Sequence, residues 1–169
     1  MSEAGANGTG APAVKVEGET VLAFLNEVAG GRKLLQLLRE RKDAGAAKIA
    51  LAAPQNQPMA GQIVDRDELA DAARSRVDVT QAVLAEFGIE AEGAVMDPDP
   101  LLALDDAIRA YEPAEVLLSC LIESRYGLLR RDLVEWARGR FEVPITHVPV
   151  RIDDDAVRWD VTHTLVVAT

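Results

Sequence analysis

Cysteine is almost absent from this sequence, which has one, Cys120, among 169 residues. A single thiol cannot close a disulfide within the chain, so a disulfide-stapled domain is excluded. Cys120 also ends an apolar run, EVLLSC at 115–120, that is typical of a strand buried on both faces. We therefore expect Cys120 to pack in the core and the protein to work in a reducing, cytoplasmic compartment.

Basic residues and long apolar runs are also scarce. Lysine and arginine number 18 against 28 acidic residues, for a formal charge of -10. A surface of this sign repels phosphate backbones and anionic headgroups, so we expect no nucleic-acid and no membrane partner. No apolar run approaches the roughly 20 residues that span a bilayer. The first residues lack a basic region followed by a hydrophobic one, so we expect no signal peptide.

The motifs of familiar catalytic and metal sites are missing too. The sequence has no Walker loop, no zinc-ligand spacing and no GxSxG around Ser119. His147 and His163 lie on separate segments, and His147 falls inside an expected strand, where a hydrogen-bonded histidine is the usual case. We therefore name no catalytic and no metal-binding residue, and no feature of the sequence points to an enzyme.

Strand-like apolar runs alternate with amphipathic helical stretches along the chain. The expected strands are 20–25, 48–53, 89–95, 115–120 and 144–150, and the expected helices are about 29–43, 66–87, 100–111 and 128–139. Strands and helices at this pitch predict right-handed crossovers and a parallel sheet. The expected fold class is α/β, with a doubly wound five-stranded parallel sheet in the order 3-2-1-4-5 and helices on both faces.

The periodicity of the first two helices assigns apolar positions to the sheet and charged positions to water. This assignment places Arg41 and Arg76 outward and Phe87 against the sheet. Gly45 and Gly88 are expected to end these two helices. The chain then divides into a disordered N-terminal arm at 1–18, the α/β domain at 19–150 and a C-terminal tail at 151–169.

The tail ends in VTHTLVVAT, an apolar run with no helix after it. Such a strand needs a partner. It adds to the sheet beside the last strand, crosses to a second subunit, or folds back as a hairpin on its own domain. The sequence leaves these three arrangements open.

Any ligand is expected at the carboxyl ends of the first and fourth strands, where the winding direction reverses. Arg125, Arg130 and Arg131 cluster around the loop after the fourth strand, and Arg32 opens the first helix near the same place. Guanidinium groups hold phosphate bidentately. The alternative is that these arginines are solvated and pair with nearby acids on a helix face.

Two acids, Asp97 and Asp99, follow the third strand in the run DPDP. Paired carboxylates beside a crevice serve as acid and base or hold a metal. More often a DPDP run is a turn followed by a helix N-cap, and Pro100 suits the first helical position. We favour the turn.

These segments together resemble a known family. The MDPDPLLALDDAI turn and helix, the EVLLSC strand and the closing PITHVPV strand resemble the universal stress protein family, nearest to a divergent branch in high-GC actinobacteria. The resemblance covers about 20–150 and implies an adenine-nucleotide alpha-hydrolase-like fold. It also implies a homodimer built on the strand that begins at Pro144 and ends at Val150, together with the tail, with Trp159 as an interface anchor.

Members of this family that bind ATP have an acid at the end of the first strand and a glycine-rich phosphate loop, GxxG, nine residues, then Gly-Ser or Gly-Thr, after the fourth. Here the first strand ends in Asn26, and Ser119, Ile122 and Arg131 stand at the three glycine positions. Side chains there crowd a phosphate. The expected nucleotide or anion site, by these correspondences and the arginine cluster, comprises Asn26, Arg32, Asp97, Ser119, Arg125, Arg130 and Arg131.

Two hypotheses of function follow. The first is a dimeric stress-response or interaction module without catalysis, which has a degenerate nucleotide loop, acts through its surface and holds at most a small anion in the crevice. The second is an ATP- or AMP-binding module in which arginines replace the glycine-rich loop. The loss of all three glycines favours the first.

Overall fold

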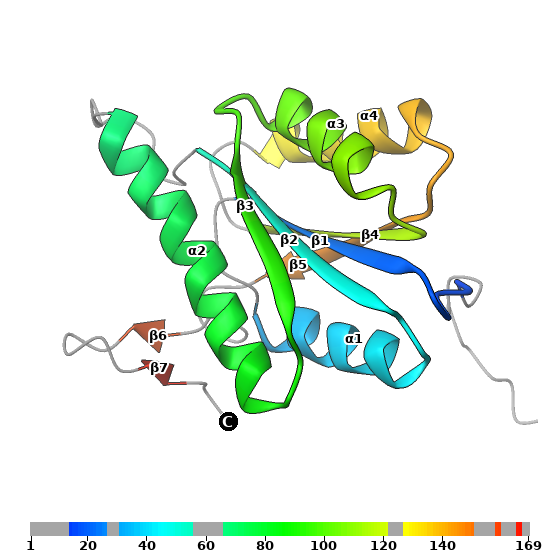
Figure 1. The fold of residues 1–169 in the computed structure, drawn as a ribbon. Helices are drawn as coiled ribbons and strands as arrows, with labels where there is room; N and C mark the ends of the chain where they lie inside the picture. Colours follow the sequence, from blue (N-terminus) through cyan, green and yellow to red (C-terminus); the bar gives the residue numbers. More distant parts are fainter. Residues whose placement is uncertain are drawn as a thin grey trace, which may run out of the picture.

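The computed structural model describes residues 14–26, 31–55, 66–121 and 127–150, and two short strands at 158–159 and 165–166. Strands and helices alternate within these ranges (Figure 1). The strands of the main sheet are β1 Thr20–Leu25, β2 Lys48–Pro54, β3 Ala91–Met96, β4 Glu115–Leu121 and β5 Ile145–Val150. The helices are α1 Arg32–Asp43, α2 Arg66–Glu86, α3 Pro100–Tyr111 and α4 Gly127–Arg140.

The five strands are parallel and lie in the order β3-β2-β1-β4-β5, which confirms the predicted α/β fold. Helices α1 and α2 cover one face of the sheet, and α3 and α4 cover the other (Figure 1). Right-handed crossovers explain this arrangement, because the chain winds outward from β1 to β3 and then returns past β1 to β4. The reversal places the carboxyl ends of β1 and β4 side by side where the helix layers part.

The strand β1 contributes to two separate cores because its side chains alternate between the faces. Val21, Ala23 and Leu25 pack with α1 and α2, and Leu22 and Phe24 pack with α3 and α4. Every residue from 115 to 120 on the neighbouring β4 is buried as well. A strand buried on both faces has a continuous apolar sequence, and for this reason both strands could be predicted from the sequence.

The strand β3 lies at one edge of the sheet and is only partly buried, as its alternating sequence predicts. Its Gly93 allows α2 to approach closely. A Cβ built at Gly93 would lie 2.2 Å from a methyl carbon of Val77. A residue with a side chain would therefore push the helix away from this edge strand.

Helix ends follow the predicted chemistry. The side chain of Asp99 caps α3 by accepting a hydrogen bond from the Leu101 N–H, and Pro100 occupies the first helical position. Gly45 and Gly88 follow α1 and α2 with φ of 97° and 73°, in the left-handed region that glycine adopts without a Cβ penalty.

The packed part of the chain begins earlier than expected. Val16, which we had placed in a disordered arm, is buried among side chains of the α1 and α2 face. Glu17 forms an isolated antiparallel bridge with Ala46, just after α1. Phe87 was wrongly placed against the sheet: α2 ends at Glu86, and Phe87 is exposed with the Arg39 guanidinium 4.3 Å from its ring centre.

The C-terminal tail contains the strands β6 Arg158–Trp159 and β7 Leu165–Val166, which pair with each other in antiparallel register. Neither joins the five-stranded sheet. Within the part of the chain that the structure describes, β5 therefore pairs with β4 on one side only. Of the three arrangements considered for the tail, addition to the sheet beside the last strand is not observed there.

Candidate functional site

The carboxyl end of the sheet between β1 and β4 is the place where the fold predicts a ligand. Asn26 follows β1 directly, and its backbone N–H donates to the carbonyl oxygen of Ser119 at 3.0 Å. Ser119 is itself paired in register with Leu25. The structure therefore places two of the predicted site residues on adjacent backbones at the point where the winding reverses.

The side chains of these two residues point to opposite faces of the sheet. Asn26 is 3% exposed, and its Nδ2 lies 3.9 Å from the sulfur of Cys120, whose side chain packs with α3 and α4. Ser119 lies on the α1 and α2 face, like Leu117 two residues before it. Its side chain is 0% exposed, and its Oγ has no hydrogen-bond partner among the described residues. A buried hydroxyl without a partner is uncommon and calls for an explanation.

Arg32 is the first residue of α1 and is exposed. The residue before it, Gly31, has extended backbone angles and provides no side-chain cap to the helix. Because α1 follows β1 in the chain, its N-terminus opens at the carboxyl end of the sheet. Arg32 therefore lies at the predicted end, as expected.

Asp97 and Asp99 form a turn rather than a pair of converging carboxylates. Oδ1 of Asp97 accepts a hydrogen bond from the Asp99 N–H at 2.9 Å, and Oδ1 of Asp99 accepts one from the Leu101 N–H at 2.9 Å. Both residues are exposed. The turn and N-cap interpretation is confirmed, while a role of Asp97 toward a ligand stays a prediction.

The predicted arginine cluster lies largely outside the described residues. Arg125 belongs to the segment 122–126, which is not described. The backbones of Arg130 and Arg131 lie in the first turns of α4, but their side chains fall outside the described part. The grouping of these arginines around the loop after β4 therefore stays a prediction.

A buried arginine that the sequence analysis misplaced lies near the same end of the sheet. Arg76 of α2 is 6% exposed, and its Nη2 donates to the carbonyl oxygen of Pro54, the last residue of β2. The prediction that Arg76 faces water was wrong. Its neighbours Ala73 and Thr80, three residues before and four after, are buried too, so Arg76 lies on the stripe that packs on the sheet.

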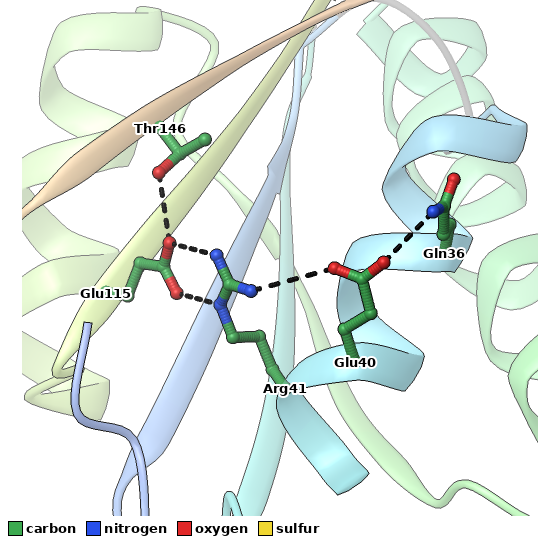
Figure 2. Close-up of polar contacts among 5 residues, drawn as sticks. All are labelled: Gln36, Glu40, Arg41, Glu115 and Thr146. Carbon is green, nitrogen blue, oxygen red and sulfur yellow. Dashed lines mark hydrogen bonds and ion pairs between the residues drawn. The ribbon is translucent and has the colours of Figure 1, made fainter. Parts of the chain in front are cut away.

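The opposite, amino end of the sheet holds a polar network that was not foreseen (Figure 2). Glu115, the first residue of β4, is 0% exposed. Its two carboxylate oxygens accept from Nε and Nη2 of Arg41 at 2.6 and 3.0 Å, and one of them also accepts from the Thr146 hydroxyl at 3.0 Å. The hydrogen bond to Glu115 raises the pKa of Arg41, although burial opposes this shift. The prediction that Arg41 faces water was therefore also wrong.

An open hollow of about 520 Å³ also lies at the amino end, against β2, β3 and the last turns of α1 and α2. Its polar lining is already engaged within the protein. Lys42 Nζ donates to the carbonyl of Ala46 at 3.2 Å, and Lys48 Nζ lies 2.6 Å from a carboxylate oxygen of Glu92. The hollow is not where the fold places a ligand, and Lys48 and Glu92 in its lining neutralise each other as an ion pair.

Two kinds of site are not found in the described ranges. The side chains described there form no group of three or more that could hold a metal ion. None of the helices described has the length and apolar character that crossing a membrane requires.

Comparison with known proteins gives one informative result. No protein-family profile and no curated protein matches the sequence. Among solved structures, a protein from the universal stress protein family of Burkholderia pseudomallei superimposes with a TM-score of 0.51 at 17% identity. The match covers 79% of this chain and 97% of that one. This chain has a universal stress protein-like fold.

The sequence resemblance places the family's glycine-rich phosphate loop after β4. The carboxyl end of β4 is therefore the position to compare with that loop. By that resemblance Ser119 corresponds to the first of the three glycine positions. Its Cβ and hydroxyl are fully enclosed, so this position is occupied by a packed side chain. The other two positions, Ile122 and Arg131, have side chains outside the described part of the structure.

Proposed function

We propose that this chain is a universal stress protein-like module that acts in the cytoplasm as a homodimer and binds other proteins without catalysis. The observation that carries the proposal is the position of β5 at the edge of the five-stranded sheet. Within the described residues β5 pairs with β4 alone, and the tail strands β6 and β7 pair with each other. An exposed strand edge is a template for pairing with another chain.

The polar groups along this edge alternate in direction. The carbonyl of Pro144 accepts from the Val116 N–H at 2.9 Å, so the backbone of residue 144 points toward β4. In a parallel ladder the backbone groups of alternate residues point to the same side. The N–H and C=O groups of Ile145 and His147, and the C=O of Pro149, therefore point away from β4.

The direction of these groups is compatible with antiparallel pairing to a second copy of β5. Two β5 strands running antiparallel about a two-fold axis beside His147 would place Ile145 of each opposite Pro149 of the other. Pro149 has no N–H to give. The carbonyl of Ile145 does not require one, because Nε and Nη2 of Arg138 already donate to it at 3.3 and 3.2 Å. This agreement favours an isologous dimer on the strand that ends at Val150.

The carboxyl end of the sheet supports the non-catalytic part of the proposal. The serine at the first glycine position is enclosed, and the two aspartates that follow β3 hold a turn. A stress-response role acting through protein partners accounts for a fold of this family in which the nucleotide loop is altered.

The dimer is tested by sedimentation equilibrium of the full chain, with wild type expected at twice the monomer mass. His147 is exposed on β5, and its substitution His147→Asp would bring two negative charges together beside the two-fold axis. We expect this variant to be monomeric and folded. Ser75→Asp, which adds the same charge on the exposed side of α2, is the matched control and should remain dimeric. A monomeric wild type, or a dimer unchanged by His147→Asp, would contradict the proposed interface.

A second candidate function is nucleotide binding through arginines. The observation in its favour is that α4 begins at Gly127, so that Arg130 and Arg131 occupy its first turns beside the loop after β4. A helix N-terminus with adjacent guanidinium groups suits a phosphate.

Isothermal titration with ATP and Mg²⁺, and with AMP, separates the two functions. Binding tighter than about 100 μM, or roughly 5.5 kcal/mol, that is lost in Arg125→Ala or Arg131→Ala would establish the nucleotide function. No binding of either nucleotide would leave the interaction module.

A further inference from the structure

The strand β3 forms the edge of the sheet opposite β5, and it is the strand nearest the viewer in Figure 1. Within the ranges that the structure describes, β3 pairs with β2 alone. On the other side of β2, the Lys48 N–H donates to the carbonyl oxygen of Glu19 at 3.3 Å, so the backbone of residue 48 points toward β1. Successive residues of a strand direct their backbone groups to opposite sides, so Ile49 points toward β3.

The direction of Ile49 determines which backbone groups of β3 face outward. In a parallel ladder a residue bonds to the two neighbours of the residue opposite it. Ile49 lies opposite Ala91, so it bonds to the residues just before and just after Ala91. The N–H and C=O groups that face away from β2 therefore belong to alternate residues of β3, namely Ala91, Gly93 and Val95.

One of these outward groups already has a partner. Nε2 of Gln81, on α2, donates to the carbonyl oxygen of Ala91 at 2.9 Å. No described residue is hydrogen-bonded to the outward groups of Gly93 and Val95, and both residues are half-buried rather than enclosed. Because an exposed strand edge is a template for pairing, two N–H and two C=O groups remain here for an added strand.

Acidic side chains surround this edge. Exposed carboxylates lie along β3 and on both sides of it in the sequence, at Glu90, Glu92, Asp97 and Asp99. The amino group of Lys48 is already paired with Glu92 at 2.6 Å. The hollow of about 520 Å³ at the amino end is lined by Gln81, Glu90 and Ala91 among other residues, so it adjoins the same edge. A strand that pairs here would therefore meet negative charge and have room for a long side chain.

We propose that β3 binds an extended, basic segment of a partner protein, which adds to the sheet as a further strand. The backbone of the segment bonds to Gly93 and Val95, and its lysine or arginine side chains meet the carboxylates around the edge. The inference rests on the proposed function, because it names the surface and the kind of partner of the interaction module. It uses the edge opposite β5, so the partner and a second subunit occupy different strands.

Isothermal titration of the full chain at low ionic strength tests the proposal, with a synthetic heptapeptide of alternating lysine and valine as the probe. Wild type is expected to bind it. The same peptide with glutamate in place of lysine should not bind, because the edge repels it. A fully N-methylated version keeps the charge but loses every N–H, so it should bind about tenfold more weakly or worse.

The variant Val95→Pro blocks the edge without removing a bond to β2, because the Val95 N–H points outward and an edge strand accepts proline at such a position. It should stay folded by circular dichroism and bind the peptide about tenfold more weakly. Val95→Ala, which also loses the valine side chain but keeps the N–H, is the matched control and should retain the affinity.

A second variant changes only charge. Glu90→Lys is exposed and therefore safe for folding, and it should weaken binding about fivefold at low salt and less at high salt. Glu135→Lys makes the same change at an exposed position of α4, on the other face of the sheet, and should have a smaller effect (Figure 1).

Amide hydrogen exchange shows where the peptide binds. Exchange at Gly93 and Val95 should slow in the complex, while Ala94, whose N–H points toward β2, should change little. The dimer and this site fail separately: His147→Asp should bind the peptide like wild type, and Val95→Pro should keep the mass of wild type in sedimentation.

Four results would overturn the proposal. They are no binding at about millimolar peptide, equal binding of the N-methylated peptide, equal affinity in Val95→Pro and Val95→Ala, and slowed exchange elsewhere than at β3. Assembly of wild type beyond the dimer that is lost in Val95→Pro would also contradict it, because a second copy of the chain would then occupy the edge.

Discussion

Two buried polar residues on the same strand, Glu115 and Ser119 of β4, differ in whether their side chains have hydrogen-bond partners. At the amino end, Glu115 is enclosed and its carboxylate is bonded by Arg41 and Thr146. At the carboxyl end, Ser119 is enclosed on the same strand and the same face, and its hydroxyl has no described partner. Buried polar groups in folded proteins are nearly always hydrogen-bonded. Glu115 is thus fixed by partners on two other elements, whereas the Ser119 hydroxyl has none among the described residues.

The largest effect is expected from breaking the network at the amino end. Arg41→Met would leave the Glu115 carboxylate buried without its cation, and removal of one partner of a buried pair costs about 3 kcal/mol or more. We expect the free energy of unfolding, measured by urea denaturation at pH 7, to fall by about this amount.

Arg39→Met on the same helix is the control. Arg39 is exposed and stacks on Phe87, so its loss should cost less than about 1 kcal/mol. Replacing both partners, in Arg41→Met with Glu115→Leu, should restore most of the stability because no charge is then left buried. Equal losses in Arg39→Met and Arg41→Met would show that the pair contributes nothing specific.

A smaller effect is expected at the bond between α2 and β2. Arg76→Met would leave the buried carbonyl of Pro54 without this donor, and an unsatisfied buried acceptor costs about 1–3 kcal/mol. The midpoint of thermal unfolding should fall accordingly. Arg74→Met, two residues earlier and exposed, should leave the midpoint nearly unchanged. The same midpoint in both variants would refute the structural role of Arg76.

The smallest effects are expected when a lysine is replaced by glutamate at either end of α1. Lys33→Glu places an acid at the positive pole and should stabilise the free protein by about 0.5 kcal/mol. Lys42→Glu, in the last turn, should destabilise it by at least as much, because Lys42 also donates to the Ala46 carbonyl. Urea denaturation in low-salt chloride buffer measures both. The same sign for the two variants would exclude an effect of the helix dipole.

The fold could be predicted from the sequence because its signals are local. Continuous apolar runs marked β1 and β4 as strands buried on both faces, and the turn at Asp97 with its N-cap at Asp99 marked the start of α3. Right-handed crossovers then determine the strand order with few alternatives. The glycines after α1 and α2 are also local signals. Glycine adopts the left-handed backbone angles of a helix end without contacts from elsewhere in the fold, so these residues predicted where the helices end.

The buried charges could not be predicted in this way. Arg41 was assigned to water by residue type, although it lies three residues after the buried Leu38 and so falls on the inner face. Its partner Glu115 is 74 residues away in the sequence, and no local pattern links the two. Helical spacing alone would have indicated that Arg76 is enclosed.

The sequence predicted the location of the candidate site better than it predicted the arrangement of the side chains there. The reversal of winding indicated the carboxyl ends of β1 and β4, and the family resemblance singled out Asn26 and Ser119 there. The structure places both residues, with Arg32, at the carboxyl end of the sheet. The sequence could not show that the side chains of Asn26 and Ser119 leave opposite faces.

The hydrogen bond from Arg76 to the carbonyl of Pro54 joins positions 22 residues apart, on either side of the segment 56–65. The bond holds α2 to β2 from outside that segment, so the register of the helix on the sheet does not depend on the segment's length. The entropy cost of closing a loop rises slowly with its length, by about 0.6 kcal/mol for each doubling. The chain can therefore accept an inserted peptide there, such as an epitope or a fluorescent reporter, and still fold.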